Sequence, residues 1–330
     1  MDLEFNSGFM SKKRSAAEWK PIIIGLVDSV APVMSKLIGR ELARAIEEQG
    51  IVTKAITLIL GKRIEEAMVP YVSAVVLLVS SAREVNEENV RKLLEVVNIE
   101  PQENFMKFIS TININTAMAA YAPALAYLAL VTDKPDAELL MRVVKSLGFS
   151  PDIETAKYAI KEYVDKGVGD NDGESRLQQK LDSSISSASK MLSRLEDMEV
   201  ERVFEMKNIE KQIGRGFVLY FGAVGVMEYL GRDIGLEGED HYKEGLRKII
   251  VATGVDPDEE MLDLMVHSLN LGNFPFVYAF AAYFIASVGQ NPDVDKMIGV
   301  VKSMGFKTDP APASYILTLY KEMSGAEKPS

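Results

Sequence analysis

Residues 121–163 read YAPALAYLALVTDKPDAELLMRVVKSLGFSPDIETAKYAIKEY, and this stretch predicts three short helices in succession. Its first part is almost entirely apolar, and its second part repeats apolar residues at the spacing of an amphipathic helix. Gly148 follows the second part, and Pro151 comes soon after it, as expected where one helix ends and another begins. The stretch therefore predicts a small helical unit.

The same unit occurs four times along the chain, and its copies are called repeats one to four. Each has a hinge residue suited to a left-handed backbone, preceded by apolar residues at fixed offsets. The hinge residues are Asn98, Gly148, Gly254 and Gly305, and the repeats span about 68–112, 118–163, 224–269 and 275–322. The hinges are 50, 106 and 51 residues apart, which predicts a duplication of a duplication.

The chain around each hinge predicts helix ends. Ser150, Asp256 or Asp309 can cap the third helix of a repeat, with proline at its first position. The position 27 residues before each hinge lies in the apolar first helix and is held by Tyr71, Tyr121, Met227 and Tyr278. We expect these residues to be equivalent.

Composition restricts the class of protein. The net charge of −11 and pI near 5.0 argue against a broad nucleic-acid-binding surface. The absence of cysteine excludes disulfides and thiol chemistry. The apolar runs at 117–131, 217–227 and 275–288 are shorter than the ~20 residues of a membrane span, so they predict buried helices. We expect a cytoplasmic protein.

The predicted fold is all-α, with two similar halves that each hold lead helices and a pair of repeats. The predicted segments are a disordered N-terminus (1–16), a first helical domain (17–165), a linker (166–174), a second helical domain (175–323) and a disordered tail (324–330). Cleavage within the linker is expected to give two separately folded halves.

The lead helix of the second half has apolar residues at coiled-coil spacing. These residues include Leu177, Leu181, Ile185, Ala188, Leu192 and Leu195. They are compatible with a homodimer through 177–195 or with a helix packed on its own domain. The second interpretation is favoured.

The sequence contains no residue set that predicts a catalytic, cofactor-binding or metal-binding site, and the protein is predicted not to be an enzyme. His267 is expected to be a partly buried structural residue, and His241 lacks a nearby partner for a metal. One aromatic stripe could line a groove for a partner helix, although core packing is the favoured interpretation. Its residues are Phe274, Phe276, Tyr278, Phe280, Tyr283 and Phe284.

Residues 68–112, MVPYVSAVVLLVSSAREVNEENVRKLLEVVNIEPQENFMKFISTI, resemble the N-terminal domain of the acidic ribosomal stalk proteins of archaea and eukaryotes. The resemblance lies in Met68, Tyr71, the run 85–90, Leu93-Leu94 and the run 98–100. In that family the small helical domain dimerises through its first apolar helix and docks on long helices of a stalk base protein. The resemblance implies that each pair of neighbouring repeats is a fused pseudo-dimer.

The family's alanine-rich hinge and its acidic tail, which recruits translation GTPases, have no counterpart here, so that activity is not implied. The expected function is that of a protein-interaction scaffold or adaptor, possibly associated with the ribosome or translation. A small-molecule or lipid-binding protein with a pocket between helix pairs is the alternative. An enzyme whose polar residues converge only in three dimensions is a third hypothesis.

Overall fold

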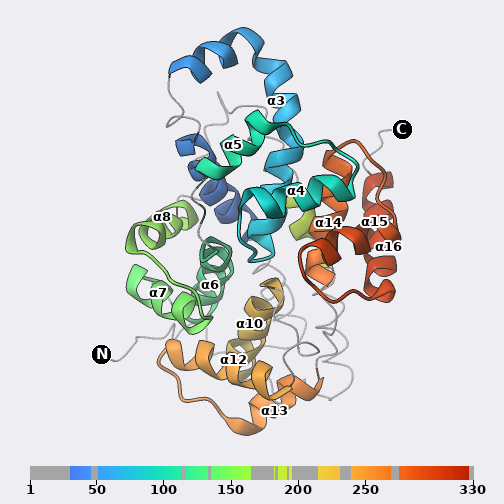
Figure 1. Cartoon of the computed structure of the whole chain (residues 1–330). Helices are drawn as coiled ribbons and strands as arrows, with labels where there is room; N and C mark the ends of the chain where they lie inside the picture. The colour runs from blue at the N-terminus through green and yellow to red at the C-terminus, as the bar shows by residue number, and fades with distance from the viewer. Residues whose placement is uncertain are drawn as a thin grey trace.

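The fold is all-α, as predicted. The computed structural model describes residues 30–45, 51–112, 114, 116–132, 135–164, 182, 185–191, 193–194, 215–230, 239–268 and 275–326. Regular structure within these ranges is helical, without a strand (Figure 1). The predicted N-terminal segment 1–16 and the linker 166–174 lie outside them. Helix α16 continues to Ala326, so the predicted disordered tail begins too early.

Each repeat consists of three consecutive helices in the part of the chain that the structure describes. Repeat one has α3 (Ile51–Ser80), α4 (Glu87–Val96) and α5 (Glu103–Thr111), and repeat two has α6 (Met118–Val131), α7 (Ala137–Ser146) and α8 (Ile153–Val164). Repeat three has α10 (Arg215–Tyr229), α12 (Glu239–Ala252) and α13 (Glu259–Ser268), and repeat four has α14 (Pro275–Ser287), α15 (Val294–Ser303) and α16 (Pro310–Ala326). Residues 30–45 form a further helix, which precedes repeat one.

The four hinges share one backbone conformation, as their sequence predicts. The φ angle is 55° at Asn98, 86° at Gly148, 86° at Gly254 and 83° at Gly305. This left-handed residue ends the second helix of each repeat and turns the chain toward the third. In repeat one the turn is closed by a hydrogen bond of 2.9 Å from the Ile99 amide to the Leu94 carbonyl. The hinge is therefore a common structural feature of all four repeats.

A tyrosine in the first helix of every repeat binds the start of the third helix. The hydroxyls of Tyr71, Tyr121 and Tyr278 accept hydrogen bonds from the amides of Gln102, Asp152 and Asp309 at 2.7, 2.6 and 3.0 Å. In repeat three the hydroxyl of Tyr220 accepts from the Asp258 amide. The prediction that Met227 is the equivalent residue is therefore wrong. Tyr220 is equivalent, and Met227 lies two helical turns further along α10.

The caps of the third helices correct the sequence prediction in part. The carboxylates of Asp152 and Asp258 accept hydrogen bonds from the amides of Thr155 and Met261, at 2.7 and 3.1 Å. Ser150 and Asp256, the predicted caps, lie two residues before these positions. Asp309 is confirmed, because its carboxylate accepts from the Ala311 amide at 2.9 Å and Pro310 opens α16.

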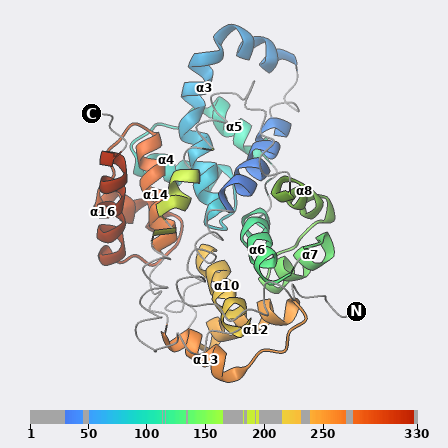
Figure 2. The same ribbon diagram turned by 180° about the vertical axis from the view of Figure 1, so that it is seen from behind.

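The repeats pack across the predicted halves. In one pair α3 packs on α14 and α4 on α15, and in the other α6 packs on α10 and α7 on α12 (Figures 1 and 2). Repeat one therefore pairs with repeat four, and repeat two with repeat three. This corrects the pairing of neighbouring repeats that the resemblance implies, and the packing does not separate 17–165 from 175–323.

The apolar first helices form the centre of the molecule. Nearly every residue of α6 is buried, which agrees with the prediction that the apolar runs form helices buried on nearly all sides. Ile185 and Ala188, two positions of the predicted coiled coil, are fully buried within the chain and are not available to a second copy. The helix of residues 30–45 joins this segment through a hydrogen bond from the Ser35 hydroxyl to the Asp182 carboxylate.

Candidate functional site

The predicted aromatic groove does not form an open surface. Tyr278, Phe280 and Phe284 are buried in the core, at 0%, 4% and 2% exposure. Tyr283 is half-buried and packs edge-on against Tyr320, with 5.4 Å between the ring centroids. Phe274 lies outside the described residues, as does the side chain of Phe276. Core packing, the favoured interpretation of this stripe, accounts for the side chains that are described.

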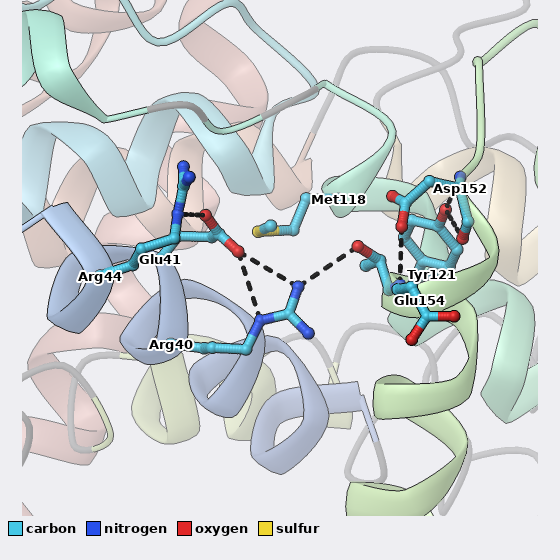
Figure 3. Close-up of a pocket in the computed structure, with 8 residues that line it drawn as sticks. Arg40, Glu41, Arg44, Met118, Tyr121, Asp152 and Glu154 are labelled. Carbon is cyan, nitrogen blue, oxygen red and sulfur yellow. Dashed lines mark hydrogen bonds and ion pairs between the residues drawn. The ribbon is translucent and has the colours of Figure 1, made fainter.

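A cleft of about 500 Å³ lies between the helix of residues 30–45 and repeat two (Figure 3). One wall comes from that helix, and the other from the starts of α6 and α8. The lining residues are Arg40, Glu41, Arg44, Met118, Tyr121, Asp152, Glu154 and Thr155. Five of them carry charged side chains, so this cleft is the candidate functional site.

Glu41 is the buried charge of the cleft. Its side chain is only 10% exposed, and each carboxylate oxygen is bound by a guanidinium. Arg40 donates to Oε1 from Nε and Nη2, at 3.2 and 3.1 Å, and Arg44 donates to Oε2 from Nε at 2.9 Å. A buried carboxylate without such partners would be strongly unfavourable. The two arginines therefore pair with Glu41 through both of its carboxylate oxygens and fix the wall.

Arg40 also connects the two walls. Its Nη2 donates to the Thr155 hydroxyl at 3.3 Å, and its guanidinium lies 4.3 Å from the centroid of the Tyr158 ring. Both residues belong to α8. Stacking of a guanidinium on an aromatic ring adds to the ionic contacts. Arg40 therefore links the 30–45 helix to α8 of repeat two.

The opposite wall is built around the tyrosine that every repeat has. The Tyr121 hydroxyl accepts from the Asp152 amide and donates to the Asp152 carbonyl at 3.0 Å. Burial raises the pKa of Tyr121 to about 12, so the hydroxyl keeps its proton at neutral pH. Glu154 lies at the rim and pairs with Lys157 at 3.1 Å. The cleft thus presents Arg40 and Arg44, both paired with Glu41, on one wall and the carboxylates of Asp152 and Glu154 on the other.

A smaller pocket of about 150 Å³ lies between repeats two and three. Its lining includes the hinge residue Gly148, Lys248 and His241, the last of which is exposed at the start of α12. His267 is exposed rather than partly buried, which corrects the prediction, and its Nδ1 lies 2.8 Å from the Asp263 carbonyl.

The described residues contain no group of three or more His, Asp or Glu side chains that could hold a metal ion. Within the same ranges, none of the helices has both the length and the apolar character needed to cross a membrane.

Comparison with known proteins gives no match. No family model, curated protein or solved structure matches the chain.

Arg40, Glu41 and Arg44 were not among the residues predicted from the sequence, although one signal was present. Glu41 follows Leu37 by four residues and Ile38 by three, which places it on the apolar face of the helix. A carboxylate on that face requires partners, and Arg40 and Arg44 are its near neighbours in the sequence. The contact with α8 could not be inferred, because it depends on tertiary packing.

Proposed function

We propose that the protein is a non-enzymatic protein-interaction scaffold that binds a partner at the cleft between residues 30–45 and α8. The observation that carries the proposal is the charged lining of this cleft, which has two arginines and Glu41 on one wall and the carboxylates of Asp152 and Glu154 on the other. Charged and polar side chains of a protein partner complement such a surface, and paired charges give specificity more than raw affinity.

The proposed setting is the ribosome or the translation apparatus. It rests on the resemblance of the repeats to the stalk proteins. In that family the small helical domain dimerises through its first apolar helix. The packing of α3 on α14 and of α6 on α10 supports the comparison, because here too the first helices pair.

The alternative is a binding protein for a small molecule. It is favoured by the volume of about 500 Å³, which falls in the range of ligand pockets. Met118 is the one aliphatic lining residue in a wall that is otherwise charged or hydroxyl-bearing. A polar, charged ligand therefore suits the cleft better than a lipid does.

The test is sucrose-gradient sedimentation of a native lysate at low and high salt, followed by immunoblotting. We expect the protein to co-migrate with ribosomes or one subunit at low salt and to be released at high salt. Migration at low salt as a free protein would contradict the ribosomal setting. Native mass spectrometry of the purified protein would detect a retained small molecule as an added mass.

The variant Arg44→Gln tests the cleft itself, because this side chain is 42% exposed and its removal leaves the contact of Arg40 with α8. We expect weaker association with the partner. Lys107→Gln on α5 is the matched control, since Lys107 is exposed and far in sequence from the cleft. Equal association of the two variants would contradict docking at the cleft, provided that both show the unfolding transition of the native protein.

A further inference from the structure

The two pairs of repeats are joined in the same way. In each pair the first helix of one repeat packs on the first helix of the other, and the second helix packs on the second. When equivalent elements meet each other, the interface is isologous, which is the arrangement of a two-fold dimer. Both pairs therefore have the form of a dimer between repeats.

Contacts between repeats one and four are reciprocal. The guanidinium of Arg83, which follows α3, lies 3.9 Å from the centroid of the Phe306 ring, at the hinge of repeat four. In the opposite direction, the side-chain amide of Gln290, which follows α14, donates to the Val97 carbonyl at the hinge of repeat one. Each repeat thus uses the segment after its first helix to contact the hinge of the other.

Repeats two and three also meet through their first helices and at a hinge. The smaller pocket is lined by the hinge residue Gly148 of repeat two and by His241 at the start of the second helix of repeat three. The first helices approach closely, since a Cβ atom added to Gly222 would lie 2.9 Å from the ring of Tyr127. The interface of this pair therefore involves the same parts of the repeat as the other.

The repeats are of two kinds, which alternate along the chain. An ion pair joins Arg91 to Glu103 in repeat one, at 3.2 Å, and Arg247 to Glu259 in repeat three, at 3.0 Å. Repeats two and four lack this pair, because the same offsets from their hinges hold Met141 with Ile153 and Ile298 with Pro310. Repeats one and three are thus one kind, and each observed pair joins one repeat of each kind.

We infer that the chain is the covalent counterpart of a two-fold dimer of a two-repeat protein. In such a dimer the first repeat of one subunit packs on the second repeat of the other, which is the pairing of one with four and two with three. Each half of the chain is then the binding partner of the other half. A second copy of the chain presents the same surface and can supply either half. This inference is independent of the proposed function.

The test uses the full chain with a protease site inserted within 166–174 and a different tag at each end. After folding and cleavage, we expect the two halves to co-elute as a 1:1 complex and to be captured together by either tag. Mixing with an untagged cleaved sample should give hybrids through exchange of halves. Halves that separate as folded monomers on native gel filtration would overturn the inference.

The variant Gly222→Ala tests the interface within the cleaved complex. The added methyl group meets Tyr127. We therefore expect the dissociation constant of the two halves to be about tenfold or more higher than in the cleaved protein without the substitution. Gly325→Ala on α16 is the matched control, because a Cβ atom there meets nothing within 4 Å and the gain in helix propensity is shared.

Equal dissociation constants for Gly222→Ala and Gly325→Ala would overturn the assigned interface. If Gly222→Ala fails to fold, Gly299→Ala gives the same test at the other pair, where the added Cβ would lie 3.1 Å from Val96.

Discussion

Removal of the Tyr121 hydroxyl should destabilise the protein through the start of α8. The ring is 1% exposed, and its hydroxyl makes two hydrogen bonds to the backbone of Asp152, at 2.6 and 3.0 Å. A net contribution of about 1 kcal/mol for each bond gives a loss of about 2 kcal/mol for Tyr121→Phe. The Asp152 amide, left without its partner, adds to this loss where water cannot reach it.

The assay is urea unfolding followed by circular dichroism. Tyr320→Phe is the matched control, because the Tyr320 hydroxyl has no hydrogen-bond partner among the described residues and its ring contact with Tyr283 is kept. We expect the control to change the free energy of unfolding by less than about 0.5 kcal/mol. If Tyr121→Phe loses no more stability than the control does, the tyrosine link is not a stabilising feature of the repeats.

Three further predictions concern the hinge, a helix cap and alkaline pH. Gly148→Ala forces a side chain into the left-handed region and should cost about 1 kcal/mol in urea unfolding, whereas Asn98→Gly should cost nothing; equal effects would contradict this. Asp293→Ala removes the cap bond to the Lys296 amide, at 2.9 Å, and should lower stability by about 1 kcal/mol. Asp295→Ala in the same turn is its control, and an equal loss there would refute the cap. Because burial raises the pKa of Tyr121 to about 12, the folded state holds a proton that the unfolded chain releases near pH 10; stability should fall from pH 10 toward 12, and less steeply in Tyr121→Phe.

The hinges were predictable because their chemistry is local. A left-handed residue after an amphipathic helix, followed by one apolar residue, specifies a helix end without reference to the rest of the chain. Asn98 was recognised as equivalent to three glycines for the same reason, and its φ of 55° confirms it. The apolar faces of the second helices were equally clear, because their spacing repeats in every copy.

The register of repeat three was not predictable by counting from its hinge. Tyr220 lies 38 residues before Asp258, whereas Tyr121 lies 31 residues before Asp152. The additional residues lie partly between α10 and α12 and partly in α12, which has 14 residues against 10 in α7. Since Met227 follows Tyr220 by two helical turns on the same face, an apolar helix matches equally well in either register. The additional residues of repeat three could have been detected by counting back from Asp258 to the nearest tyrosine on the face of α10 that holds Met227.

The sequence gives a weaker signal for which repeat packs on which. Glycine inside a helix costs about 1 kcal/mol relative to alanine, so a glycine retained there indicates that another element approaches closely. Gly222 and Gly299 both lie inside helices, and each meets a side chain of the paired repeat, Tyr127 in one case and Val96 in the other.

These glycines show that a neighbour comes close, but not which one. Four first helices of similar apolar character can be matched in several ways, because burial alone has no direction. The reciprocal contacts at the hinges of repeats one and four are specific to this pairing. Those contacts involve single residues such as Gln290, whose partner is a backbone carbonyl and has no sequence pattern of its own.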